Sequence, residues 1–194
     1  MPCRTARLAI QRFAYSSRVA CRSELRGACA DLLRRFEQPV LVESYLPGRE
    51  MTVGIVGNDG SGEDPQVVGV MEVVFKDGSD TDYTALNKAE YEARIEYRLL
   101  DGEPLAQRAR EVALGAYRAL SCRDVARVDL RCDASGEPCF IETNPLPGMH
   151  PVRSDLPIMS RLAGISYPEL LGRIEEPAGR RWGLSRRRVS AGSW

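Results

Sequence analysis

The sequence has few lysines, a single histidine and no long apolar run. Only Lys76, Lys88 and His150 represent these two residue types in 194 residues. No segment approaches the roughly 20 apolar residues that a transmembrane helix needs. Residues 1–17 lack the apolar core and the cleavage site of a secretory signal. These absences argue against a membrane-spanning or secreted protein, and the 43% of hydrophobic and 28% of charged residues are typical of a globular one.

The cysteine pattern also excludes one class of site. Six cysteines at positions 3, 21, 29, 122, 132 and 139 contain no C-x-x-C pair. With one histidine beside them, they argue against a zinc site and favour reduced thiols in a cytoplasmic protein. Cys132 and Cys139 flank a turn, so they could approach each other or remain ordinary buried thiols.

The net charge of zero hides basic ends. Residues 1–26 hold six Arg and one Glu, and residues 177–194 hold five Arg and no acidic residue. Basic ends can bind nucleic acid. No aromatic interleaving or recognition motif accompanies them, so we expect solvated tails and no nucleic-acid partner.

The apolar pattern predicts helices and strands in alternation. We expect Ser23 to cap a helix that ends before Pro39, followed by a buried strand from Pro39 to Leu46. After a turn at Pro47–Arg49, two further strands joined by a loop complete a predicted antiparallel meander of three strands. The expected elements that follow are strands 50–58, 66–75 and 94–99, a long loop over 77–93, a helix from 104, a helix over 158–163 and a last helix through 174.

A β-hairpin is predicted in ARVDLRCDASGEPCFIETNPLPGM, residues 126–149. Two alternating runs flank a segment rich in turn residues. If the hairpin is symmetric about Ser135 and Gly136, residues whose numbers sum to 271 lie opposite each other. Asp129 then faces Glu142 and Arg127 faces Asn144, on one face of the two strands.

Facing carboxylates on this hairpin suggest a metal site. They repel by roughly 0.2–1 kcal/mol, and a divalent cation would offset that. Asp129, Glu142 and the Asn144 amide would supply the hard oxygen ligands that Mg²⁺ prefers. The alternative is a solvated strand face whose carboxylates pair with Arg127 and Arg131. Spacing alone leaves both open, and the stiff Asn-Pro-Leu-Pro-Gly loop that follows favours the metal.

This stretch resembles the metal-binding hairpin and following loop of the D-alanine–D-alanine ligases, which are members of the ATP-grasp superfamily. The resemblance implies an α+β fold of the ATP-grasp type, with a mostly antiparallel sheet and flanking helices. It also implies that Asp129, Glu142 and Asn144 hold two Mg²⁺ (or Mn²⁺) ions on the ATP phosphates. Arg127 would then stabilise the phosphorylated intermediate.

A second resemblance to the same family lies in QPVLVESYLPGREMTVGIVGN, residues 38–58. It implies that Glu43, Ser44, Tyr45 and Leu46 line the adenine site and that Glu50 binds the ribose. The open alternatives are that Tyr45 and Leu46 are ordinary core residues and that Glu50 is a solvated strand start.

Two further parts of the site are implied by resemblance. YTALNKAEYEARIEYRL, residues 83–99, resembles the tail of a loop that closes over ATP, which makes Lys88 a phosphate contact. The alternative is a solvated lysine, and Ala89 stands where the family has a tyrosine. Gly148 and Ser154 match the acceptor loop that binds the second D-alanine, if that loop has one extra residue. His150 is expected to be structural or merely nearby.

The resemblance runs from about Cys21 to Ile174 and covers only the C-terminal portion of the family. We expect an unassigned basic segment over 1–22, a partial lid over 23–46, an ATP and metal domain over 47–176, and a disordered tail over 177–194. The lid is expected to be incomplete. A glycine-rich phosphate loop is not expected at Ser16-Ser17, because Tyr15 and Ala20 stand near the positions where such a loop requires glycine.

The implied activity is that of an ATP-dependent carboxylate–amine ligase, acting through an acyl phosphate in cytoplasmic peptidoglycan (cell-wall) synthesis. Its small-molecule substrates would be ATP and D-alanine, with no membrane partner and with a homodimer left open. Two alternatives remain. One is an ATP-grasp ligase for another amino acid. The other is a non-catalytic remnant or subunit that binds ATP and Mg²⁺.

Overall fold

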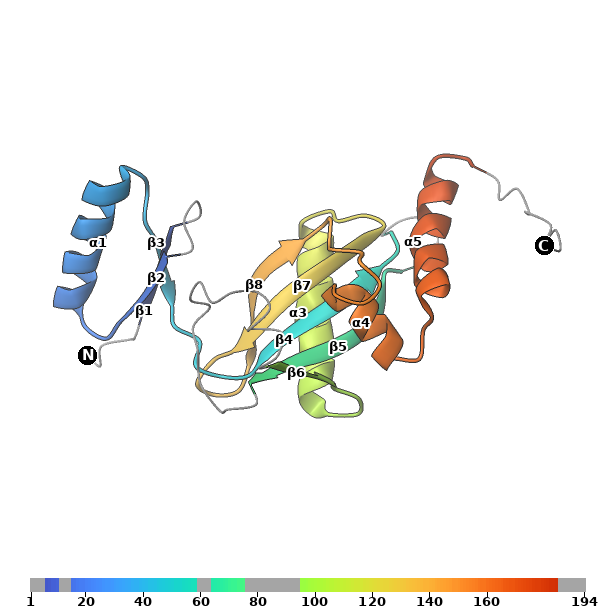
Figure 1. Ribbon diagram of the computed structural model, residues 1–194, viewed down its shortest axis with the longest axis horizontal. Coiled ribbons are helices and arrows are strands. Elements are labelled where there is room, and N and C mark those ends of the chain that lie inside the picture. The colour runs from blue at the N-terminus through green and yellow to red at the C-terminus, as the bar shows by residue number, and fades with distance from the viewer. Residues whose placement is uncertain (1–5, 11–14, 59–63, 76–94, 185–194) are drawn as a thin grey trace. The chain divides into compact units, whose positions relative to one another are not determined.

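Two compact units make up the part of the chain that the computed structural model describes, which is residues 6–10, 15–58, 64–75 and 95–184 (Figure 1). The N-terminal unit comprises Met1–Gly48 and Val74–Glu96. The hairpin unit comprises Arg49–Val73 and Tyr97–Trp194. Each unit is described by itself.

The described residues of the N-terminal unit form a three-stranded antiparallel sheet and one helix. Its elements are β1 (Ala6–Ile10), β2 (Tyr15–Val19), α1 (Arg22–Phe36) and β3 (Leu41–Ser44), with the strand order β2-β1-β3. Val19 and Leu32 form a small buried core to which α1 contributes further apolar side chains. The sequence pattern predicted no element for residues 6–10 and 15–19, which form two of the three strands of this sheet.

Two details of the N-terminal unit differ from expectation. Helix α1 begins one residue before Ser23, so that Cys21 is the N-cap and the expected Ser23 cap is wrong. Glu24 accepts a hydrogen bond from the Ala20 amide at 2.8 Å and satisfies a backbone donor before the first turn. The buried strand expected before Leu46 is also wrong, because all four residues of β3 are exposed at the edge of the sheet.

The hairpin unit is built on a five-stranded sheet in the order β6-β5-β4-β7-β8. Neighbouring strands from β5 to β8 pair in antiparallel fashion. This arrangement confirms the predicted α+β fold and the antiparallel pairing of the strands predicted over 50–58 and 66–75. The predicted meander is wrong in its first strand, because β3 pairs with β1 in the other sheet. The strands are β4 (Glu50–Val56), β5 (Gln66–Phe75), β6 (Ile95–Leu99), β7 (Val125–Cys132) and β8 (Pro138–Asn144).

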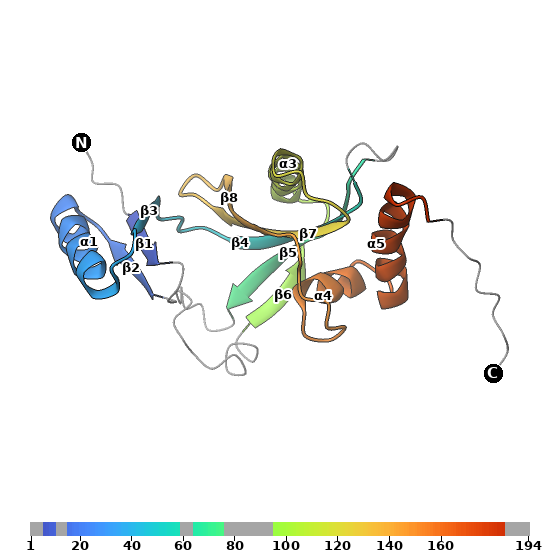
Figure 2. The same cartoon turned by 90° about the horizontal axis from the view of Figure 1, so that it is seen from above.

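Helices cover the two faces of this sheet (Figure 2). Helix α3 (Pro104–Ala119) places Ala109, Ala113 and Tyr117 against alternate residues of β4 and β7, in a core that is almost fully buried. Helix α4 (Asp155–Leu162) packs on the opposite face through Leu156 and Met159. Leu120 directly follows the helix and is 57% exposed.

A pair of glycines lets α4 approach the sheet closely. Gly54 of β4 pairs with Gly69 of β5. A Cβ atom at Gly54 would lie 2.5 Å from Leu156 Cδ1, and one at Gly69 would lie 3.0 Å from Met159 Cγ. Glycine inside a strand commonly marks such an approach. Here the two glycines leave room for the Leu156 and Met159 side chains of α4.

The last helix is longer than expected. Helix α5 spans Tyr167–Arg181, whereas we expected it to end near Ile174 and to be followed by a disordered tail beyond Glu176. Ser166 caps it by accepting a hydrogen bond from the Glu169 amide. Within the described ranges, none of the helices is long and apolar enough to cross a membrane.

Candidate functional site

The β7–β8 hairpin has the predicted register over its functional half. Asp129 lies opposite Glu142, and Arg127 lies opposite Asn144. The register shifts by one beyond Asp129, so that Leu130 pairs with Phe140. This bulge, which a symmetric hairpin does not include, leaves Ile141 as the extra residue.

Local chemistry explains the turn of the hairpin. The Asp133 carboxylate accepts hydrogen bonds from the amides of Ser135 and Glu137 and from the Ser135 hydroxyl. These bonds to the charged form lower the pKa of Asp133. Cys132 and Cys139 beside the turn are free thiols, and burial raises the pKa of Cys132.

The predicted metal ligands converge on one face of the hairpin. The Asn144 side-chain nitrogen lies 3.1 Å from Asp129 Oδ2 and 3.1 Å from Glu142 Oε1. The Thr52 hydroxyl on β4 donates to Asp129 Oδ1 at 2.7 Å and orients that carboxylate. Two carboxylates and an amide are therefore gathered around one point.

Arg127 lies beside this cluster and contacts two carboxylates. Its Nε and Nη2 donate to Asp129 at 3.0 and 2.8 Å, and its Nη1 donates to Asp155 at 2.7 Å. Burial acts to lower the pKa of Arg127, but the hydrogen bonds to Asp129 and the nearby carboxylate charges outweigh it and raise the pKa. Arg127 therefore stays a cation at the edge of the cluster.

Arg131 does not take part in this arrangement. The alternative to a metal site required the hairpin carboxylates to pair with Arg127 and Arg131. Asp129 does pair with Arg127, whereas Arg131 lies 3.6 Å from the Glu50 carboxylate on β4. Glu142 instead accepts a hydrogen bond from the Asn144 amide.

The donor set fits a hard divalent cation. Among the described residues, no group of three or more His, Cys, Asp or Glu side chains is placed to hold a metal ion. A Mg²⁺ ion commonly takes only one or two carboxylates and completes its shell with substrate phosphates and water. Asp129 and Glu142 supply two carboxylates, and Asn144 could turn its amide oxygen toward the same point, since a half-turn of the amide exchanges its oxygen and nitrogen.

The two predicted acceptor residues lie against each other. A Cβ atom at Gly148 would lie 2.7 Å from the Ser154 Oγ, so only glycine fits there without a shift. The Ser154 Oγ accepts a hydrogen bond from the His150 amide at 3.0 Å. The His150 Nδ1 accepts from the amides of Val152 and Arg153, which agrees with a structural role for this histidine.

The predicted adenine residues lie in the N-terminal unit. Glu43 and Ser44 are exposed on β3, while Tyr45 and Leu46 are half-buried just after it. The Arg18 guanidinium stacks over the Tyr45 ring at 4.0 Å. The expected ribose ligand Glu50 belongs to the hairpin unit, and Lys88 lies outside the described residues.

Sequence reasoning missed the partners that orient these groups. Thr52 and Asp155 contact Asp129 and Arg127, and the Tyr97 hydroxyl donates to Asp155 at 3.0 Å. The position of Asp155 could have been noticed in the sequence, because it is an acidic residue at the start of a helix, directly after Ser154. Thr52 carried no signal, because its contact follows from the β4–β7 pairing.

An ion pair between Arg49, just before β4, and the nearly buried Glu72 was also missed. Arg49 donates to both oxygens of Glu72, at 2.6 and 2.9 Å, and also to Glu103. The bidentate contact with Glu72 raises the pKa of Arg49. The Glu72 side chain is only 8% exposed, and a single acid within the apolar strand QVVGVMEVVF was a signal for such a partner. Arg49 thereby anchors the chain next to Glu50.

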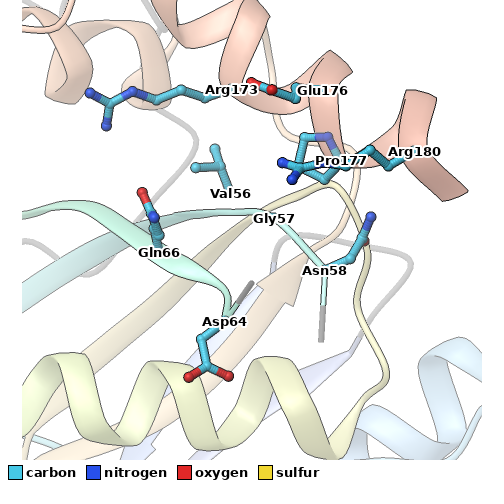
Figure 3. Close-up of a pocket in the computed structure, with 9 residues that line it drawn as sticks. All are labelled: Val56, Gly57, Asn58, Asp64, Gln66, Arg173, Glu176, Pro177 and Arg180. Atoms are coloured by element: carbon cyan, nitrogen blue, oxygen red, sulfur yellow. The ribbon is translucent and has the colours of Figure 1, made fainter. Parts of the chain in front are cut away.

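A cavity of about 220 Å³ lies away from this cluster, between α5 and the ends of β4 and β5 (Figure 3). Arg173, Glu176 and Arg180 of α5 line one side, and Asn58 and Gln66 line the other. Val56 is four residues beyond Thr52, which is about 13 Å along the strand. The cavity shares no residue with the candidate site.

Comparisons with known proteins show the family to which most of the chain is related. The family model described as "D-ala D-ala ligase C-terminus" matches residues 16–176. A D-alanine–D-alanine ligase from Pelotomaculum thermopropionicum is 32% identical over 167 residues, which cover 84% of this chain and 49% of that protein. The chain thus spans about half the length of the curated relatives it matches.

Solved structures show the same relationship. A D-alanine–D-alanine ligase from Bacillus anthracis in complex with ATP superposes with a TM-score of 0.67 at 25% identity, covering 92% of this chain and 55% of that one. The VanG D-Ala:D-Ser ligase from Enterococcus faecalis superposes with a TM-score of 0.63 at 26% identity, covering 89% and 49%. The chain therefore belongs to the D-alanine–D-alanine ligase family of ATP-grasp proteins and corresponds to the C-terminal part of those ligases.

Proposed function

We propose that the chain carries the ATP and metal part of an ATP-dependent ligase similar to D-alanine–D-alanine ligase. In this reaction ATP phosphorylates the carboxylate of one D-alanine. The amine of a second D-alanine then attacks the acyl phosphate, a C–N bond forms, and inorganic phosphate leaves. Membership of the family and the ATP bound to the related Bacillus anthracis ligase support this proposal.

The observation that carries the proposal is the cluster on β7 and β8. The carboxylates of Asp129 and Glu142 meet at the Asn144 amide group, and the Arg127 cation lies beside Asp129. When bound there, Mg²⁺ (or Mn²⁺) would offset the negative charge of the ATP phosphates. Arg127 would bind and orient the phosphorylated intermediate through its remaining N–H groups.

The remaining proposed roles follow the same family analogy. Glu43, Ser44, Tyr45 and Leu46 would contact adenine, Glu50 the ribose, and Lys88 a phosphate. Gly148 and Ser154 would hold the acceptor, since the glycine leaves room beside the serine hydroxyl. We also propose a cytoplasmic location, in keeping with the free thiols of the described cysteines.

A phosphate-release assay with D-alanine and MgATP tests the proposal on the full 194-residue chain. We expect D-alanine-dependent phosphate release that falls on the order of 100-fold in Asp129→Ala, the scale of losing one electrostatic group in a site. Glu169→Gln is the matched control, because it removes an exposed carboxylate that pairs with its helix neighbour Arg173, away from the hairpin. Folded protein that releases no phosphate would contradict an autonomous enzyme and favour a non-catalytic ATP-binding part.

A ligase with a different acceptor is the second candidate. The Asp155 carboxylate follows Ser154 directly, so the α4 end carries a negative charge beside the expected carboxylate-binding residue. The related VanG protein is named as a D-Ala:D-Ser ligase, so acceptors differ among the relatives. The same assay with D-serine and other amino acids in place of the second D-alanine distinguishes the two candidates.

A further inference from the structure

The Arg127 guanidinium is held between carboxylates from two different elements. Asp129 lies on the same strand, whereas Asp155 begins helix α4. The side chains of these three residues are 23–29% exposed, so solvent screens their interaction only in part. Because the donors of a guanidinium are fixed in one plane, the two carboxylates together set its orientation.

Asp155 is itself held in place without Arg127. The Tyr97 hydroxyl on β6 donates to its Oδ1 at 3.0 Å, which leaves Oδ2 for Arg127. The first turn of a helix favours a negative charge. Leu156 and Met159 of the same helix are fully buried against the sheet near Gly54. The Asp155 carboxylate is therefore held in one position, and the longer Arg127 side chain extends to reach it.

A guanidinium and a metal ion would compete for Asp129. Arg127 donates to both oxygens of that carboxylate, and Thr52 and Asn144 donate to them as well. A divalent cation on Asp129 would have to displace some of these donors. Arg127 can yield a contact at lower cost if a second carboxylate keeps its charge compensated.

We propose that Asp155 is a positioning residue that holds Arg127 from a second side, so that a cation can take the place of Arg127 on Asp129 while the guanidinium keeps a charge partner. The inference rests on the proposed function, in which Asp129 holds a divalent cation and Arg127 binds the intermediate. Asp155 gives the guanidinium a second anchor when the cation binds. It thereby links the metal face of the hairpin to the end of α4 that carries Ser154.

Mn²⁺ affinity of the full chain tests this role without any substrate. Free Mn²⁺ is followed by its electron paramagnetic resonance signal during a titration. We expect Asp155→Asn to weaken Mn²⁺ binding by about tenfold, the low end of what loss of an outer-shell partner costs. Tyr97→Phe should weaken it by about threefold in the same direction, since one hydrogen bond to Asp155 is lost with no change in charge.

A double-mutant cycle separates positioning from a simple charge effect. In the Arg127→Gln background no guanidinium remains to be held, so Asp155→Asn should change Mn²⁺ affinity less than about twofold. Glu169→Gln removes one negative charge elsewhere on the hairpin unit and should leave the affinity unchanged. An equal loss from Asp155→Asn in both backgrounds would overturn the inference, because the acid would then act without Arg127.

Nuclear magnetic resonance gives a readout that does not depend on the metal. The Arg127 Nε–H signal is identified by its loss in Arg127→Gln. We expect Asp155→Asn to move this signal and to speed its exchange with water, and Asp155→Glu to restore part of the protection. An unmoved signal would overturn the inference. Wild-type chain that binds no Mn²⁺ would instead refute the proposed metal site, and with it the competition that Asp155 is proposed to relieve.

Discussion

At the scale of single residues, the candidate site is organised around the Asp129 carboxylate, which several side chains contact. Asp129 accepts hydrogen bonds from Thr52, Arg127 and Asn144, so each of its oxygens is shared by two donors. Three donor side chains from three strands, β4, β7 and β8, leave this carboxylate little freedom to rotate. The same residues thus keep the hairpin face ordered and present a carboxylate to a cation.

The Arg49–Glu72 pair yields a prediction about stability at the residue scale. Arg49→Gln leaves a nearly buried carboxylate without its bidentate partner, because the Glu72 side chain is only 8% exposed. We expect a loss of about 1–3 kcal/mol in the free energy of unfolding, the usual range for a buried group left without its charged partner. Urea unfolding at neutral pH measures it.

The control for that variant is an exposed pair in the same unit. Arg173→Gln removes the partner of Glu169, and both side chains are well exposed on α5. Such a pair contributes about 0–1 kcal/mol. If Arg49→Gln proved no more destabilising than Arg173→Gln, the Arg49–Glu72 pair would not anchor the start of β4.

At the scale of elements, helix α4 connects the core to the site. Its buried face rests on the glycine pair of β4 and β5, and its first residue contacts Arg127. The position of Asp155 therefore depends on how closely the helix approaches the sheet. Packing in the core and geometry in the site are coupled through this one short helix.

Gly54→Ala tests the close approach of α4. The new methyl group would lie 2.5 Å from Leu156 Cδ1, in a core with no space for it. We expect a loss of about 1–3 kcal/mol in the free energy of unfolding, as for other overpacked cores. Urea unfolding measures the loss, and the Arg127 Nε–H signal should shift as α4 moves.

A second glycine provides the control for that substitution. Gly115 lies inside α3 and is exposed, and a methyl group added there would meet no atom within 4 Å. Gly115→Ala should stabilise the protein by up to about 1 kcal/mol, because alanine is the better helix former. A Gly54→Ala variant as stable as the wild type would show that α4 can retreat freely.

The sequence predicted local pairing better than tertiary packing. The facing of Asp129 and Glu142 followed from alternation and turn residues, which are properties of neighbouring positions. The bulge at Ile141 and the contact between Asp155 and Arg127 depend on strands and helices distant in the chain. The exposure of β3 was missed for a similar reason, because an apolar run does not say whether its strand lies at an edge.

At the scale of the whole molecule, the chain belongs to the D-alanine–D-alanine ligase family and spans only part of its relatives. The match to the Pelotomaculum ligase covers 84% of this chain but only 49% of that ligase. The residues proposed for adenine lie in one compact unit and those proposed for metal lie in the other. We propose that this chain binds ATP together with a divalent cation, which Asp129, Glu142 and Asn144 would hold.

Isothermal titration calorimetry of the full chain with ATP tests that claim most directly. We predict saturable binding in the presence of Mg²⁺ that weakens at least about tenfold with EDTA, or when Asp129→Asn removes a proposed metal ligand. Glu169→Gln should bind as the wild type does. Circular dichroism confirms that each protein is folded. Folded wild-type chain that shows no binding, or binding that ignores both Mg²⁺ and Asp129, would contradict the account.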